Sequence, residues 1–208
     1  MKISSPLNKI LDNEAKVKIL RFLIKTKTEW NGRQIAKEIG VTPATAHKAL
    51  HGLYGEGILL LRNVGKTHIY SLKKDNYLVL NLLEPLFAKE GKVFDDIVES
   101  IRKKISRSSI KKAITSVVLF GSVNLHTDKP ASDIDLAVLI KDAGNRQKVS
   151  KFFEDMDKKF SKEFGNTIST YINTEAEFKN KYKKGLGIIK NILKSSRLIC
   201  GKELKEML

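Results

Sequence analysis

Residues 117–140 read VVLFGSVNLHTDKPASDIDLAVLI, and this stretch decides the fold of the second half of the chain. Its two apolar runs, 117–120 and 136–140, each predict a buried β-strand. Asp133 and Asp135 lead into the second run and are separated by one residue. Because side chains alternate along a strand, we expect both carboxylates on the same face, where they can hold a divalent metal.

A Gly-Ser pair ends the first apolar run. Gly121 leaves the backbone bare and Ser122 adds a hydroxyl, so this turn is predicted to receive phosphate groups. The pattern therefore predicts a site for Mg²⁺ and a nucleoside triphosphate, with Gly121, Ser122 and Ser132 as nucleotide contacts. An ordinary β-loop-β unit with a polar turn is the alternative. That alternative leaves unexplained why two aspartates share one face of an apolar strand.

Residues 121–140 resemble the signature of the DNA polymerase β-like nucleotidyltransferases in their small prokaryotic "minimal nucleotidyltransferase" form. The resemblance covers about residues 106–200. It implies a mixed sheet flanked by helices and a catalytic role for Asp133 and Asp135 as the metal ligands. The implied reaction moves a nucleoside monophosphate from an NTP to a hydroxyl acceptor, with Mg²⁺ as cofactor. It leaves the acceptor open, including a protein such as a partner toxin.

Two features that the resemblance implies are missing from this sequence. Family members often carry an arginine where this chain has Leu125, and a third carboxylate on a later strand. The matching strand, residues 167–172, contains no acid and has Ser169 at that position. Two functions remain open: a nucleotidyltransferase, or a transcriptional regulator whose second domain is a weak or inactive nucleotide sensor or a dimerisation scaffold.

Nearby glutamates have simpler roles than metal binding. The sequence 174–177, TEAE, predicts a capping box in which Thr174 and Glu177 bond each other's backbone N–H. Glu163 ends a Lys-rich helix predicted over residues 146–164. We therefore expect neither Glu163 nor Glu177 to complete the metal site.

The first part of the chain predicts a winged helix-turn-helix. Helices are expected over residues 14–25, 32–39 and 43–54, capped by Asn13, Asn31 and Thr42. Strands over 58–62 and 67–72 with a turn at 63–66 predict the wing. Residues 9–73 resemble prokaryotic winged-helix regulators related to the ArsR and MarR groups, which implies duplex DNA as a partner and a homodimer.

The DNA contacts are predicted on the exposed side of the third helix and on the wing. Counting Lys and Arg against Asp and Glu gives about +8 for residues 1–75. Protein contacts or dimerisation are the alternative use of such a domain. His47 and His51 have no third ligand in view, so zinc is not expected. The predicted contacts are Thr42, Pro43, Ala44, Thr45, His47, Lys48, His51, Arg62 and Lys66.

Composition agrees with a nucleic-acid partner. The 208 residues carry a formal charge of +16, which favours polyanions, although a generally Lys-rich proteome is an alternative cause. No apolar run reaches the roughly 18 residues needed to span a bilayer, and the start has no secretory h-region. A single cysteine, Cys200, excludes an internal disulfide. A cytoplasmic location is expected.

The predicted fold class is α/β (α+β), in three parts. Residues 1–74 form the winged helix-turn-helix and residues 107–208 the nucleotidyltransferase-like domain. Residues 75–106 form a helical connector whose first helix is capped by Asp75.

Overall fold

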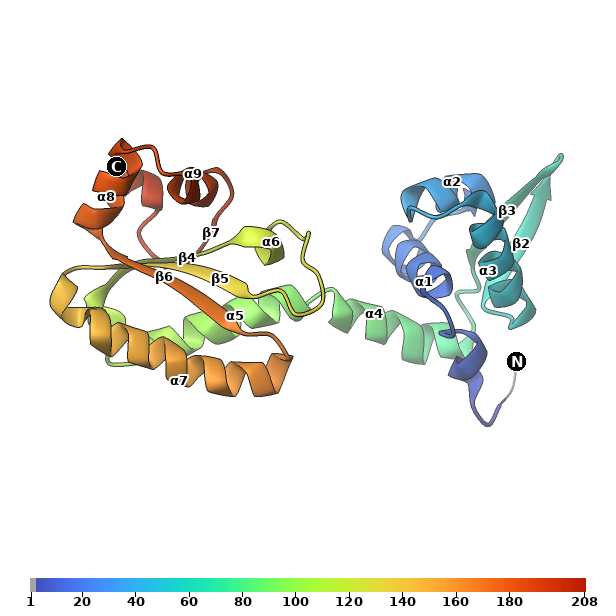
Figure 1. Ribbon diagram of the computed structural model, residues 1–208. Coiled ribbons are helices and arrows are strands. Elements are labelled where there is room, and N and C mark those ends of the chain that lie inside the picture. The colour runs from blue at the N-terminus through green and yellow to red at the C-terminus, as the bar shows by residue number, and fades with distance from the viewer. Residues whose placement is uncertain (1–2) are drawn as a thin grey trace. The chain divides into compact units, whose positions relative to one another are not determined.

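The computed structural model describes residues 3–208 and divides the chain into two compact units, Met1–Val93 and Phe94–Leu208 (Figure 1). The division falls inside the stretch predicted as a helical connector. The three-part domain organisation stays a prediction. Within residues 3–208, no helix is both long and apolar enough to cross a membrane.

The first unit has the element order of a winged helix-turn-helix, as predicted. Its sheet has the order β1-β3-β2, and β2 and β3 form the wing. Buried side chains from all three helices of this domain fill one core, with Leu20, Leu50 and Leu53 fully enclosed. The elements are α1 (Glu14–Thr26), β1 (Trp30–Asn31), α2 (Gly32–Glu38), α3 (Pro43–Gly55), β2 (Leu59–Val64) and β3 (Thr67–Leu72).

The predicted N-caps of these helices are confirmed. The Asn13 side chain accepts a hydrogen bond from the Lys16 N–H at 3.0 Å, and Thr42 accepts one from the Thr45 N–H at 3.2 Å. Asn31 forms a full capping box with Gln34. Each cap satisfies backbone donors that the first helical turn leaves without partners.

Two local predictions were wrong. The strand β2 continues to Val64, so the wing turn contains only Gly65 and Lys66, with Gly65 at φ 58°. A two-residue hairpin favours positive φ, which glycine adopts without strain.

The cap before the next helical segment is Asn76, not Asp75. The Asn76 side chain accepts from the N–H groups of Leu78 and Val79. A π-helical turn, η2 (Val79–Leu83), and α4 (Glu84–Glu90) follow.

The second unit is a four-stranded mixed sheet with helices on both faces. Its strand order is β6-β5-β4-β7, and only the β5–β6 pair is parallel. Short 3-10 turns at Lys111–Ala113, Ala143–Asn145 and Leu204–Met207 complete it. The main elements are α5 (Val93–Ser106), β4 (Ile114–Phe120), α6 (Gly121–Asn124), β5 (Ile134–Ile140), α7 (Arg146–Phe164), β6 (Ile168–Thr174), α8 (Glu175–Lys183), α9 (Gly187–Lys194) and β7 (Arg197–Gly201).

The two faces of this sheet are covered by different helices. Figure 1 shows α5 and α7 on one side and α8 and α9 on the other. On the α5–α7 side, Leu136 and Val138 of β5 pack in one core. On the α8–α9 side, Ala137 and Leu139 pack with Phe178 in another. This alternation explains why β5 is an almost unbroken apolar run.

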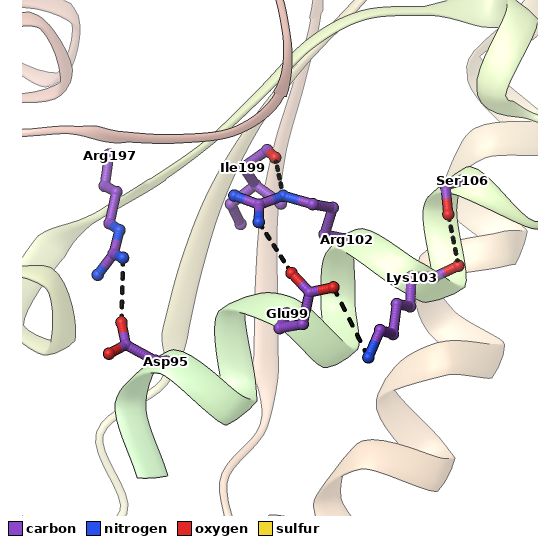
Figure 2. A network of polar contacts seen from close by, with 7 residues as sticks. All are labelled: Asp95, Glu99, Arg102, Lys103, Ser106, Arg197 and Ile199. Atoms are coloured by element: carbon purple, nitrogen blue, oxygen red, sulfur yellow. Dashed lines mark hydrogen bonds and ion pairs between the residues drawn. The ribbon is translucent and has the colours of Figure 1, made fainter. Parts of the chain in front are cut away.

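The outer strand β7 is fastened to α5 by two arginines (Figure 2). Arg102 donates to the Ile199 carbonyl oxygen at 2.8 Å and pairs with Glu99 on its own helix. Arg197 pairs with Asp95 at 3.0 Å. These contacts fix β7 beside β4, the strand that leads into the Gly-Ser pair.

Candidate functional site

The two predicted carboxylates lie where three strands of the second unit meet. Asp135 is the second residue of β5 and stands opposite Phe120, the last residue of β4. On its other side Asp135 is paired with Ser169 of β6. Asp133 precedes β5 and is exposed. The end of β4 and the starts of β5 and β6 therefore converge at the Asp-Ile-Asp segment.

Gly121 packs directly against Asp135. A Cβ atom at residue 121 would come within 2.2 Å of the Asp135 Oδ2 atom, and Gly121 has φ 78°. Both facts require glycine, because a side chain would collide with the carboxylate and would strain the backbone. The Gly-Ser pair and the Asp-x-Asp pair thus form one site, although 13 positions separate Ser122 from Asp135.

The Gly-Ser segment is helical rather than an open turn. Gly121 and Ser122 begin α6, and the Thr127 N–H donates to the Ser122 carbonyl oxygen at 3.0 Å. A first helical turn leaves N–H groups without intrahelical acceptors, and such groups can donate to phosphate oxygens. Ser132 lies just before Asp133, but its hydroxyl accepts from the Lys129 N–H at 2.8 Å and closes the loop. Its nucleotide contact stays a prediction.

The carboxylate pair carries uncompensated negative charge. The pKa of the Asp135 carboxyl is raised, first by its burial and then by the charge of Asp133. In residues 3–208 neither carboxylate forms an ion pair with a cationic side chain, and Asp133 accepts a hydrogen bond from the Thr167 hydroxyl. A divalent cation would relieve the repulsion, and carboxylate and hydroxyl oxygens are suitable ligands for Mg²⁺.

The described part of the chain supplies no third acid. It contains no group of three His, Cys, Asp or Glu side chains placed to hold a metal. Because paired residues of neighbouring strands point to the same face, Ser169 lies beside Asp135 with a hydroxyl. The residues present therefore fit one cation held by two carboxylates and do not fit a three-carboxylate metal centre.

The nearby glutamates have structural roles, as predicted. Glu177 accepts from the Thr174 N–H at 2.8 Å and pairs with Arg146 at 2.5 Å. Both contacts hold the pKa of Glu177 below its usual value, and the hydrogen bond from the Thr174 backbone has the larger effect. Glu163 pairs with Lys104 at 3.4 Å.

No cation replaces the missing arginine within the Gly-Ser motif itself. Leu125 is exposed, and Asn124 donates to the Ser195 carbonyl oxygen at 3.0 Å. His126 adopts φ 55° and places its ring 4.9 Å from that of Phe94. The Asn124 bond ties α6, which begins at Gly121, to the end of α9.

In the first unit, five of the nine predicted DNA-contact residues line two separate hollows. A cavity of about 650 Å³ lies between the start of α2, the start of α3 and the wing. Its lining includes the predicted His47 and Lys66 together with Arg33 and His68, which sequence reasoning missed. Lys48 and Thr45 line a separate hollow beside the start of α1.

One face of α3 lies in the core, where Ala46, Ala49, Leu50 and Leu53 are buried. The rings of His47 and His51 stack 6.5 Å apart, and residues 3–208 bring no third ligand to them. All of the predicted contacts on α3 and its cap are exposed or partly exposed: Thr42, Pro43, Ala44, Thr45, His47, Lys48 and His51.

Arg62 is the one predicted DNA contact with a carboxylate partner among the described residues. Its guanidinium lies 2.6 Å from Glu29, and both side chains are more than half exposed. Exposed pairs contribute little to stability and exchange readily, so phosphate can compete with Glu29 for this arginine.

Several solved structures and one family model are similar to parts of this chain. The first unit is similar to winged-helix structures. Reduced HlyU from Vibrio cholerae is 22% identical over 40% of this chain and 83% of its own, with a TM-score of 0.35. The homodimeric winged helix-turn-helix domain of Mb0332 from Mycobacterium bovis is 25% identical over 45% and 79%, with a TM-score of 0.34.

A structure described as a toxin-antitoxin with AMP-PNP is 15% identical over 55% of this chain and 77% of its own, with a TM-score of 0.35. No curated protein matches the chain. The model of the family described as Polymerase beta, Nucleotidyltransferase matches residues 101–205, which include both carboxylates and the Gly-Ser pair. This match spans just over half of the 208 residues, and the chain belongs to the Polymerase beta nucleotidyltransferase family.

Proposed function

We propose that this protein binds duplex DNA through its first unit and transfers a nucleoside monophosphate from an NTP to a hydroxyl acceptor in its second. The observation that supports the proposed transfer is the packing of Asp135 against the Cα atom of Gly121, which has no side chain. It brings a pair of metal-binding carboxylates to the helical turn that would receive the triphosphate.

Each residue of the site has a distinct task in this reaction. Asp133 and Asp135 would hold Mg²⁺, which would neutralise charge on the phosphates. Gly121 and Ser122 orient the triphosphate through backbone N–H groups and a hydroxyl. The acceptor oxygen forms a bond to the α-phosphorus, the bond to pyrophosphate breaks, and the hydroxyl proton passes to solvent. Since Ser169 cannot take that proton as a carboxylate would, we expect slow turnover.

The direct experiment is incubation with each α-labelled NTP, Mg²⁺ and candidate acceptors, with calorimetry of NTP binding in parallel. Transfer that requires Mg²⁺ supports the enzyme. Binding without transfer favours the second candidate, a nucleotide sensor, for which the Asp135–Ser169 pairing is the specific observation. Absence of binding would contradict both and leave a dimerisation scaffold.

The substitution Ser169→Asp separates slow enzyme from sensor. A third carboxylate beside Asp135 is expected to tighten Mg²⁺ binding about tenfold through its added charge. It would also supply a proton acceptor, so transfer should become faster. Ser169→Asn is the matched control, because it has similar size without the charge. Equal Mg²⁺ affinity in both variants would show that residue 169 does not face the metal.

DNA binding is tested by the salt dependence of duplex affinity. We expect the dissociation constant to rise steeply with salt concentration. A plot of its logarithm against the logarithm of the salt concentration should have a slope of about 0.9 for each phosphate contact. Lys48→Ala and Arg62→Ala should each lower the slope by about one and weaken binding to all duplexes alike. Lys25→Ala, an exposed lysine at the end of α1, is the control. A salt-independent affinity would refute the proposal. We also propose a homodimer, since paired half-sites need two-fold symmetry.

A further inference from the structure

The hollow between α2, α3 and the wing of the first unit is surrounded by basic side chains. We call it the basic pocket. Among the described residues its lining includes no Asp or Glu, whereas two acids line the hollow beside the start of α1. A hollow with cations and no acid favours an anion as its ligand. The basic side chains are Arg33 of α2, His47 of α3, Lys66 of the wing turn and His68 of β3.

Strand pairing and helical spacing bring these side chains to one place. β1 pairs with β3 in antiparallel register, with Asn31 opposite Ile69. The residues that follow Asn31 and begin α2 therefore run past His68. On α3, His47 and Leu50 both line the pocket, because residues three apart share one face of a helix. Separate segments of the folded domain thus fix the walls of the basic pocket.

The floor of the basic pocket is apolar and closely packed. Leu50 is fully buried, and Tyr70 is only 4% exposed. A Cβ atom at Gly32 would lie 3.4 Å from the Leu50 Cδ1 atom and 3.7 Å from the Tyr70 Cε2 atom. Because this floor keeps water from one side, a charge bound above it is screened less than a charge on an open surface.

None of the four basic side chains forms an ion pair within residues 3–208. Arg62 of the wing, by contrast, pairs with Glu29. Arginine and lysine keep their charge near neutral pH, so the pocket carries two positive charges when both histidines are neutral and four when both are protonated. A bound anion would relieve the repulsion among these like charges.

The basic pocket lies between the two elements that are predicted to contact DNA. A recognition helix enters the major groove, and phosphate contacts on either side of it position the protein on the duplex. A duplex that contacts both α3 and the wing therefore carries one backbone strand across the hollow between them.

We propose that the basic pocket binds a phosphate group and that protonation of His47 and His68 strengthens this binding. The duplex as source of the phosphate rests on the proposed DNA binding, whereas the pocket does not, since a free phosphate compound has the same chemistry. Phosphate binding and proton uptake favour each other. Histidine ordinarily changes charge near pH 6.5, so affinity is greatest below that pH and falls as the pH rises through it.

The other groups around these histidines do not titrate in this range. Lysine and arginine side chains stay charged, and burial raises the pKa of Tyr70, so its hydroxyl stays neutral. The chain has four histidines, and the remaining two do not line the pocket: His51 on α3 and His126 in the second unit. The surrounding charged and titratable groups are Arg33 of α2, Lys48 and His51 of α3, Lys66 of the wing turn and Tyr70 of β3.

The binding test uses the full chain and a short fluorescein-labelled duplex at constant ionic strength, at about pH 5.5 and about pH 7.5. Sequence-independent phosphate contacts make any duplex a suitable probe. The variant H47Q/H68Q removes both histidines of the pocket. The control H51Q/H126Q removes the two histidines outside it. All four side chains are exposed or partly exposed, and circular dichroism confirms that the variants fold.

We expect the unsubstituted protein to bind the duplex about 20-fold more tightly at the lower pH, with each charged histidine–phosphate contact contributing about four- to fivefold. The plot of log Kd against log salt concentration should be steeper there by about 1.8, at about 0.9 for each added cation. H51Q/H126Q should keep both effects, and H47Q/H68Q should lose them. An affinity that is independent of pH, or a pH dependence that survives in H47Q/H68Q, would overturn the inference.

Arg33 tests the site without titration. Arg33→Gln should weaken duplex binding about tenfold at both pH values and lower the salt slope by about one, because a permanent cation is lost. Lys37→Gln is the matched control, since it removes an exposed cation from the same helix outside the pocket. Equal effects of the two substitutions would contradict a phosphate site at Arg33.

Inorganic phosphate separates this inference from the proposed DNA binding. In a titration at about pH 6, the Hε1 proton NMR signals of His47 and His68 should shift to saturation while that of His126 does not. Such shifts without duplex binding at any pH would uphold the pocket with a free phosphate compound as its ligand and contradict DNA binding. Duplex binding that is independent of pH would keep DNA binding and contradict the inference. Unchanged signals with both phosphate and duplex would also overturn it.

Discussion

Asp133→Ala is expected to abolish NTP-dependent labelling of any acceptor, with a loss of about a thousandfold or more. A metal ion on a transferring phosphoryl group supplies several kcal/mol, and each 1.4 kcal/mol is roughly tenfold in rate. The fold should tolerate the change, because Asp133 is exposed and precedes β5. Removing its charge also removes the second cause of the raised Asp135 pKa, so the metal-free protein should not lose stability.

The measurement combines a labelling assay with calorimetric titration of Mg²⁺ and NTP. Asp128→Ala is the matched control: it removes an exposed aspartate from the same loop and should leave labelling unchanged. Asp133→Asn separates the effect of the charge from that of the side chain's size. The amide is similar in size to the carboxylate and can still accept a hydrogen bond from the Thr167 hydroxyl. Transfer that survived in Asp133→Ala would show that the site has been placed wrongly.

Gly121→Ala should reduce transfer about a hundredfold while the unit remains folded. The added methyl group would meet the Asp135 carboxylate at 2.2 Å, so one of the two groups must move. Alanine at φ 78° adds about 1–2 kcal/mol of backbone strain. Because positioning of reacting groups is sensitive to shifts of about 1 Å, both the proposed metal ligand Asp135 and the proposed triphosphate turn would be affected.

Gly187→Ala is the control for this change. Gly187 begins α9, needs no positive φ, and a Cβ atom added to it would meet no other atom within 4 Å. The substitution should leave transfer unchanged and slightly raise the melting temperature, since alanine is favoured in helices. Thermal unfolding followed by circular dichroism separates lost function from lost folding. Full NTP affinity in folded Gly121→Ala would show that Gly121 does not shape the nucleotide site.

Local features of both units followed from the sequence alone. The caps at Asn13, Asn31, Thr42 and Thr174 were readable because each depends on residues within four positions of one another. The strands β4 and β5 could be predicted because helices cover both of their faces, which requires continuous apolar runs. The Gly-Ser and Asp-x-Asp pairs also stood out, as polar residues at the ends of those runs.

Contacts between distant residues were decided only by the tertiary structure. The parallel register of β5 and β6 puts Ser169 beside Asp135, and the turn into α6 puts Gly121 against the same carboxylate. The pairing of Arg62 with Glu29, and the cavity that Arg33 and His68 share with the wing, had no local signal.

The physical reason is the range of the interactions. Caps, turns and periodicity act through neighbouring residues, so a short stretch of sequence contains all of their causes. Strand register and side-chain clustering depend on how separate segments bury their apolar faces together, and several arrangements satisfy the same local pattern. The sequence by itself thus determined an Asp-x-Asp pair at the start of a buried strand and a winged helix-turn-helix with a net positive charge. The fold decided that Asp135 meets a glycine on one side and a serine on the other.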